Sequence, residues 1–145
     1  MSASKKIVLL AAMTSLAALS AQAADITLLN PSSSLIHPYF RSNCWDPSIS
    51  TAKPNEWVFF GGVLSHSQFT WPAFETLLRP GCKRPDVSFT FALDGEAAPT
   101  GHGNRERTTR LEFDATVPVY TLTVTDVPEL TSVTPKGYHD DDNDD

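Results

Sequence analysis

The chain has 145 residues, with 17 Asp and Glu side chains against 11 Lys and Arg, so its formal net charge at pH 7 is −6. An acidic chain without a basic stripe offers little to phosphate groups, which argues against a nucleic-acid partner. The length suits a single domain.

The first 23 residues predict a secretory signal peptide. Lys5 and Lys6 precede an uncharged, mostly apolar run over residues 7–19, and Ala21-Gln22-Ala23 follows as a small-residue cleavage site. The run is shorter than the roughly 20 residues of a membrane span. We therefore expect cleavage after Ala23 and a secreted or periplasmic protein without a membrane span. An uncleaved N-terminal anchor is the alternative.

Two cysteines, Cys44 and Cys82, remain after cleavage. An oxidising compartment allows them one intramolecular pairing. Closing a loop of that length stabilises a fold by about 4 kcal/mol on the chain-entropy model. Neither cysteine belongs to a C-x-x-C pattern, so the sequence predicts a structural disulfide, Cys44–Cys82, rather than thiol chemistry or a metal site.

Short segments of alternating apolar and polar residues predict strands. Eleven prolines and seven glycines interrupt the chain at short intervals, and no convincing helical period follows the signal. The expected strands are residues 26–29, 35–40, 57–63 with Gly61-Gly62 as a bulge or bend, 67–71, 87–93, 110–113 and 120–124. Residues 72–78, bounded by prolines, predict one helical turn. The fold class is therefore all-β, an antiparallel β-sandwich of about seven strands, with a small β-barrel as the alternative.

The domain is expected to cover residues 24–134, followed by an acidic tail at 135–145. Five of the last six residues are aspartates, which repel one another and bury little, so the tail is predicted to be disordered. A divalent-cation site is the functional alternative for this tail.

Aromatic side chains are the strongest indication of a binding surface. Trp45 and Trp57 are expected in the core. Tyr39 and Trp71 are expected near turns, where an exposed ring can bind a sugar or an apolar side chain.

A loop of the second half supplies three further candidates. His102 lies between two glycines, and Arg105 and Arg107 form a local basic cluster that suits an acidic ligand group. No two of the four histidines have the spacing of a local metal site. We therefore predict no metal and no cofactor, with Tyr39, Trp71, His102, Arg105 and Arg107 as candidate ligand-binding residues.

The sequence contains no motif of a catalytic nucleophile. The first functional hypothesis is thus a non-catalytic binding module for a glycan or a protein, with no assigned catalytic residue. A secreted hydrolase or metal-dependent enzyme that uses His66 or His102 is one alternative. An inhibitor of a secreted hydrolase, or a self-associating surface protein, is the other. The oligomeric state stays open.

Overall fold

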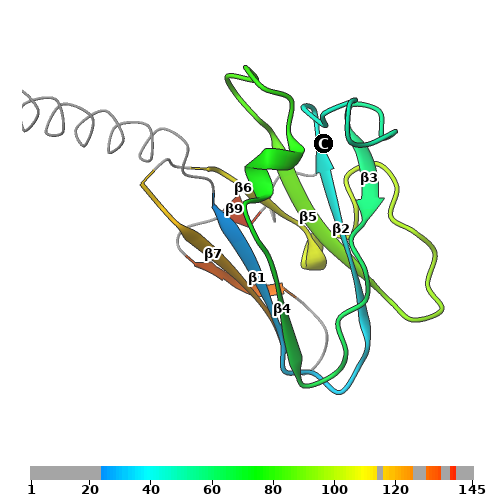
Figure 1. Cartoon of the computed structure of the whole chain (residues 1–145). Helices are drawn as coiled ribbons and strands as arrows, with labels where there is room; N and C mark the ends of the chain where they lie inside the picture. Colours follow the sequence, from blue (N-terminus) through cyan, green and yellow to red (C-terminus); the bar gives the residue numbers. More distant parts are fainter. Residues whose placement is uncertain (1–23, 114–115, 126–129, 135–137, 140–145) are drawn as a thin grey trace, which may run out of the picture.

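A computed structural model of the chain describes residues 24–113, 116–125, 130–134 and 138–139, so the predicted signal peptide and residues 140–145 lie outside the described residues. Two β-sheets face each other across an apolar core (Figure 1). The predicted all-β sandwich is confirmed, as is the disulfide between Cys44 and Cys82. Among the described residues, no helix is long and apolar enough to cross a membrane.

The first sheet has the strand order β4-β1-β7-β8. Its strands are β1 (Asp25–Asn30), β4 (Ser67–Trp71), β7 (Val119–Val124) and β8 (Leu130–Thr134). Strand β1 pairs antiparallel with β4 but parallel with β7. The sandwich is therefore antiparallel except at this one pair.

The second sheet has the strand order β3-β2-β5-β6-β9 and antiparallel pairs throughout. Its strands are β2 (Ile36–Ser42), β3 (Glu56–Phe59), β5 (Val87–Leu93), β6 (Thr109–Leu111) and β9 (Tyr138–His139). Strands β8 and β9 were not predicted, and β9 lies within the segment expected to be a disordered tail. Strand β3 ends at Phe59 rather than Val63, because positive φ at Gly61 turns the chain before Val63 rejoins Ile36.

Aromatic rings fill one end of the core. Phe40, which is fully buried, packs against four rings with centroid distances of 4.7 to 5.3 Å: Phe60, Trp71, Phe74 and Phe89. Phe74 begins the short 3₁₀ helix η1 (Phe74–Leu77), drawn in green across one end of the gap between the sheets in Figure 1. The helical turn expected at residues 72–78 is thus present, and it closes the core.

Candidate functional site

Alternation along β2 produces the outer surface of the second sheet. Ile36 and Phe40 are buried between the sheets, whereas His37, Tyr39 and Arg41 are only partly buried on the opposite side. In the pairing register, Phe59 of β3 lies opposite Tyr39, and Trp57 lies opposite Arg41. Directly opposed residues of an antiparallel pair share a face. Two neighbouring strands therefore place their rings on one outer surface.

Phe59 lies next to two other rings of this surface, both of them on β2. Its centroid is 5.5 Å from that of His37 and 5.4 Å from that of Tyr39, with interplanar angles of 40° and 48°. Half of the Phe59 residue surface is exposed to solvent. We call His37, Tyr39 and Phe59 the ring cluster.

Trp57 belongs to the same face, but its bonding groups are already engaged. Its indole Nε1 donates a hydrogen bond to the carbonyl of Gly101 at 3.0 Å. The Arg41 guanidinium lies 4.9 Å from the centre of the indole, and Arg41 Nη1 donates to the same Gly101 carbonyl at 2.6 Å. Trp57 thus attaches the loop that follows β5 to the sheet, and the ring cluster stays open beside it.

A titratable pair lies at one end of the ring cluster. His37 Nε2 is 3.4 Å from Asp94 Oδ1, and the Asp94 side chain is largely exposed. This pair and the Tyr39 hydroxyl supply groups that can donate and accept hydrogen bonds beside an exposed apolar ring.

An apolar pocket of about 200 Å³ borders Phe59 on the side of the open β3 edge. It is lined by Trp45, Ile49, Ser50, Val58, Phe59, Phe60 and Leu77. Ile49 at its rim is 56% exposed. For comparison, an engineered apolar cavity of about 150 Å³ holds one benzene, so this pocket is large enough for one apolar side chain or a similar group.

The structure brings only one of the predicted binding residues, Tyr39, into the ring cluster. The expectation that Trp71 is exposed is wrong. Trp71 is 8% exposed, and its Nε1 donates to the Phe60 carbonyl at 3.3 Å. The inward position of Trp71 opposite Ile26 of β1 is the cause, since Ile26 lies fully in the core.

The loop candidates do not converge on the ring cluster either. His102 is exposed next to Gly101, and Arg105 begins the 3₁₀ helix η2 (Arg105–Arg107). Arg107 Nη1 donates to Glu96 Oε1 at 2.6 Å, and its guanidinium lies 5.1 Å from the centre of the Phe91 ring. The bond from Arg107 lowers the pKa of Glu96, and a bond from the Leu93 backbone N–H lowers it further. Arg107 therefore has a structural role in holding this loop.

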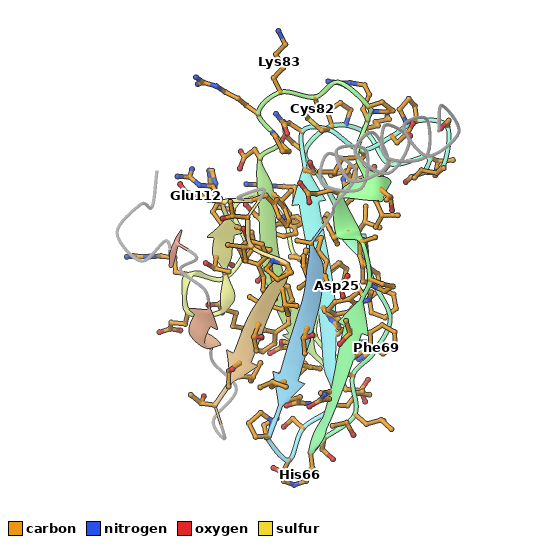
Figure 2. All side chains as sticks on the ribbon, turned by 60° about the vertical axis from the view of Figure 1, so that its left-hand side comes forward. Asp25, His66, Phe69, Cys82, Lys83 and Glu112 are labelled. Carbon is orange, nitrogen blue, oxygen red and sulfur yellow. A yellow bond between two sulfur atoms is a disulfide. The ribbon has the colours of Figure 1, made fainter. Side chains whose placement is uncertain are left out.

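His66 and His102, the histidines of the enzyme alternative, are not part of the ring cluster. His66 occupies a turn with φ of 55°, at the end of the molecule opposite Cys82 and Lys83 (Figure 2). His37 contacts the carboxylate of Asp94, and neither His66 nor His102 takes part in that contact. In the part of the chain that the structure describes, no three His, Cys, Asp or Glu side chains come close enough to hold a metal ion.

Sequence reasoning missed His37 and Phe59 as site residues. The signal for Phe59 was the alternation that puts it on the same face as Trp57. That alternation did not reveal which face points inward, and it did not reveal that Phe59 pairs with Tyr39 across the strands.

No family model matches this chain, and no curated protein matches it. A solved structure, the NMR structure of a protein from Eubacterium rectale, aligns with 80% of this chain and 91% of its own length. Its sequence identity is 11% and the TM-score is 0.38. This likeness carries no argument about fold or function.

Proposed function

We propose that this chain is an exported, non-catalytic binding module that holds a glycan against the ring cluster of His37, Tyr39 and Phe59. The observation that carries the proposal is the half-exposed Phe59 ring beside the rings of His37 and Tyr39, both of which carry hydrogen-bonding groups. A sugar ring presents an apolar C–H face that packs on an aromatic face, and its hydroxyls need donors and acceptors around that contact.

The polar groups of the cluster suit this ligand. His37 and Asp94 provide a donor and acceptors, and the hydroxyl of Tyr39, two residues along β2 from His37, provides both kinds. Residues Trp57 and Arg41 are bonded to Gly101, so the loop beside the cluster is already in place. A surface ordered in advance loses less entropy when a ligand binds.

The test compares two phenylalanines with nearly equal exposure. Phe59 is 50% exposed on β3, and Phe69 is 51% exposed on β4 of the other sheet. The processed protein is screened on a glycan array and on insoluble polysaccharides, and the affinity for the best glycan is measured for F59A, Y39A and F69A. We expect F59A to weaken binding about tenfold or more, which is about 1.4 kcal/mol, while F69A binds as the parent protein does. Equal losses in F59A and F69A, or no glycan bound at all, contradict the proposal.

A protein ligand is the second candidate, and the apolar pocket beside Phe59 favours it. A pocket of about 200 Å³ next to an edge strand suits an apolar anchor side chain from a partner. An inhibitor or a self-associating surface protein would use the same feature. The variant I49D places a charge at the exposed rim of the pocket. It is expected to abolish such a protein contact, whereas a glycan held by the ring cluster is retained.

The hydrolase alternative now depends on His37 and Asp94 rather than on His66 or His102. It predicts that H37A and D94N each stop turnover of a bound glycan. The binding-module proposal predicts that the parent protein releases that glycan unchanged.

A further inference from the structure

Ala24 is held tightly at the point where the predicted signal peptide ends. Its backbone nitrogen donates to Glu75 Oε1 at 2.9 Å, and its carbonyl accepts from the Phe74 N–H at 2.8 Å. Only 3% of the residue is exposed. Both partners belong to η1, which closes one end of the core.

Asp25 continues this attachment at the start of β1, the strand on which Figure 2 labels it. Its N–H donates to the Pro118 carbonyl at 2.9 Å, and its side-chain Oδ1 accepts from the Ala73 N–H at 2.8 Å. Four hydrogen bonds therefore hold residues 24 and 25 against two distant segments of the chain.

The bond to Glu75 has a chemical consequence if the chain is cut before Ala24. A peptide N–H is neutral and has one proton to donate, whereas an α-ammonium carries a full positive charge and three protons. The bond from a neutral N–H to the ionised Glu75 carboxylate is already stronger than a bond between neutral groups, and an ammonium adds the attraction of a second full charge. The contact is partly buried, and even a partly buried ammonium gains from a charged partner, because burying an unpaired charge is costly.

We propose that Ala24 is the first residue of the mature protein and that its α-ammonium forms an ion pair with the Glu75 carboxylate. A signal peptidase hydrolyses the Ala23–Ala24 peptide bond with one water molecule. The new carboxylate leaves with residues 1–23, and the new amine on Ala24 takes up a proton at neutral pH. The predicted cleavage site, Ala21-Gln22-Ala23, ends immediately before this nitrogen.

This inference rests on the export proposed above, but it is independent of the ligand. A failed glycan screen leaves it untouched. An N-terminus other than Ala24, in turn, would not affect the proposal that the ring cluster binds a glycan.

The first experiment locates the N-terminus. The full chain is produced in a secreting bacterial host, and the exported protein is analysed by intact mass and N-terminal sequencing. We expect a chain that begins at Ala24. A different first residue overturns the proposal.

The second experiment asks whether the ammonium itself interacts with Glu75. E75Q is compared with its parent in two exported proteins: the natural chain, and one with a single Gly inserted between residues 23 and 24. The insertion returns the Ala24 nitrogen to a peptide N–H and moves the ammonium one residue away. We expect E75Q to lower the Tm of the natural chain by about 3–8 °C and that of the extended chain by clearly less.

A matched control and a fallback complete the design. E106Q removes an exposed carboxylate in the first turn of η2 and is expected to act equally in both proteins. If E75Q does not fold, the Gly insertion alone is informative, because it should lower the Tm of the parent chain by a similar amount. If E75Q lowers the Tm of both proteins equally, the ion pair is contradicted. It is also contradicted if the Gly insertion leaves the Tm of the parent chain unchanged.

Discussion

The indole Nε1 of Trp57 donates a hydrogen bond to the carbonyl of Gly101 at 3.0 Å, across 44 residues of sequence. This bond joins the outer side of an edge strand to the loop after β5, which runs past β3 and back in yellow-green in Figure 1. Arg41 donates to the same carbonyl. Trp57 is therefore a structural residue on an outer face, and the neighbouring Phe59 is the ring that remains open to a ligand.

The packing of this loop gives a prediction for Gly103. Gly103 has φ of +77°, and a Cβ added there would lie 2.8 Å from Thr108 Oγ1 and 3.4 Å from an edge carbon of Trp57. Thr108 cannot easily retreat, because its hydroxyl is bonded to Thr90 and to the Asn104 carbonyl. We expect G103A to lower the free energy of unfolding by about 3 kcal/mol, from strain and from displaced contacts.

A substitution at Gly95 measures the cost of backbone strain without the cost of displaced contacts. It has φ of +87°, with nothing within 4 Å of an added Cβ. G95A should therefore lower the free energy of unfolding by about 1 kcal/mol, from backbone strain alone. Urea denaturation of both variants measures the difference, and equal losses would show that the loop does not resist the added methyl group.

A second prediction concerns Asn30, which is 1% exposed at the end of β1. Its amide nitrogen donates to the carbonyls of Ser34, Val63 and Leu64 at 2.8 to 3.2 Å, and its Oδ1 accepts from Ser32. One side chain thus connects the turn after β1 to the segment between β3 and β4. N30A removes all of these hydrogen bonds from a buried position, so we expect a loss of about 2–3 kcal/mol in the free energy of unfolding.

Asn104 serves as the comparison for that measurement. It is exposed, and its side chain accepts from the Glu106 N–H at the start of η2. N104A should cost about 1 kcal/mol, as the loss of a helix cap does. Chemical denaturation that ranks N104A as the more damaging of the two would contradict the role given to Asn30.

The third prediction is a pH dependence at Glu96. Arg107 holds the pKa of Glu96 below its usual range, so the unfolded chain binds a proton at a higher pH than the folded one. The resulting stability is present above the unfolded pKa of about 4.3, and it is lost as the pH falls through the lower folded value. The stability difference between the parent and E96Q should therefore shrink between pH 7 and pH 3.

Urea denaturation at both pH values measures this change. The effect is small because 43% of the Glu96 side chain is exposed, where solvent screens the pair. A difference for E96Q that is constant with pH would mean that the contact with Arg107 contributes nothing.

Strand positions were the most predictable part of this fold. The predicted bounds 67–71 and 87–93 match β4 and β5 residue for residue, although β5 is buried on both faces rather than on alternate residues. The pairing of Cys44 with Cys82 was predictable because the chain has only two cysteines. Strands β8 and β9 were missed: β9 spans only two residues, too few for any alternation to be recognised.

The candidate site was much less predictable. Tyr39 was identified correctly as a partly exposed ring, but Trp71 was not. Both lie on strands, and a strand exposes one face or the other according to its position in the sandwich. Trp71 is opposite Ile26 and faces the core, whereas Phe59 is opposite Tyr39 and faces out. A short stretch of sequence shows the alternation of a strand, but it does not show which strand will pair with it.

Local periodicity and counting are enough to predict the all-β class, the bounds of most strands and the one possible disulfide. They do not predict which rings share a surface, which indole nitrogens are already bonded, or that the Ala24 nitrogen contacts Glu75. These are contacts between residues 11 to 51 positions apart. They depend on strand register and on the packing of two sheets, and no short stretch of sequence specifies either.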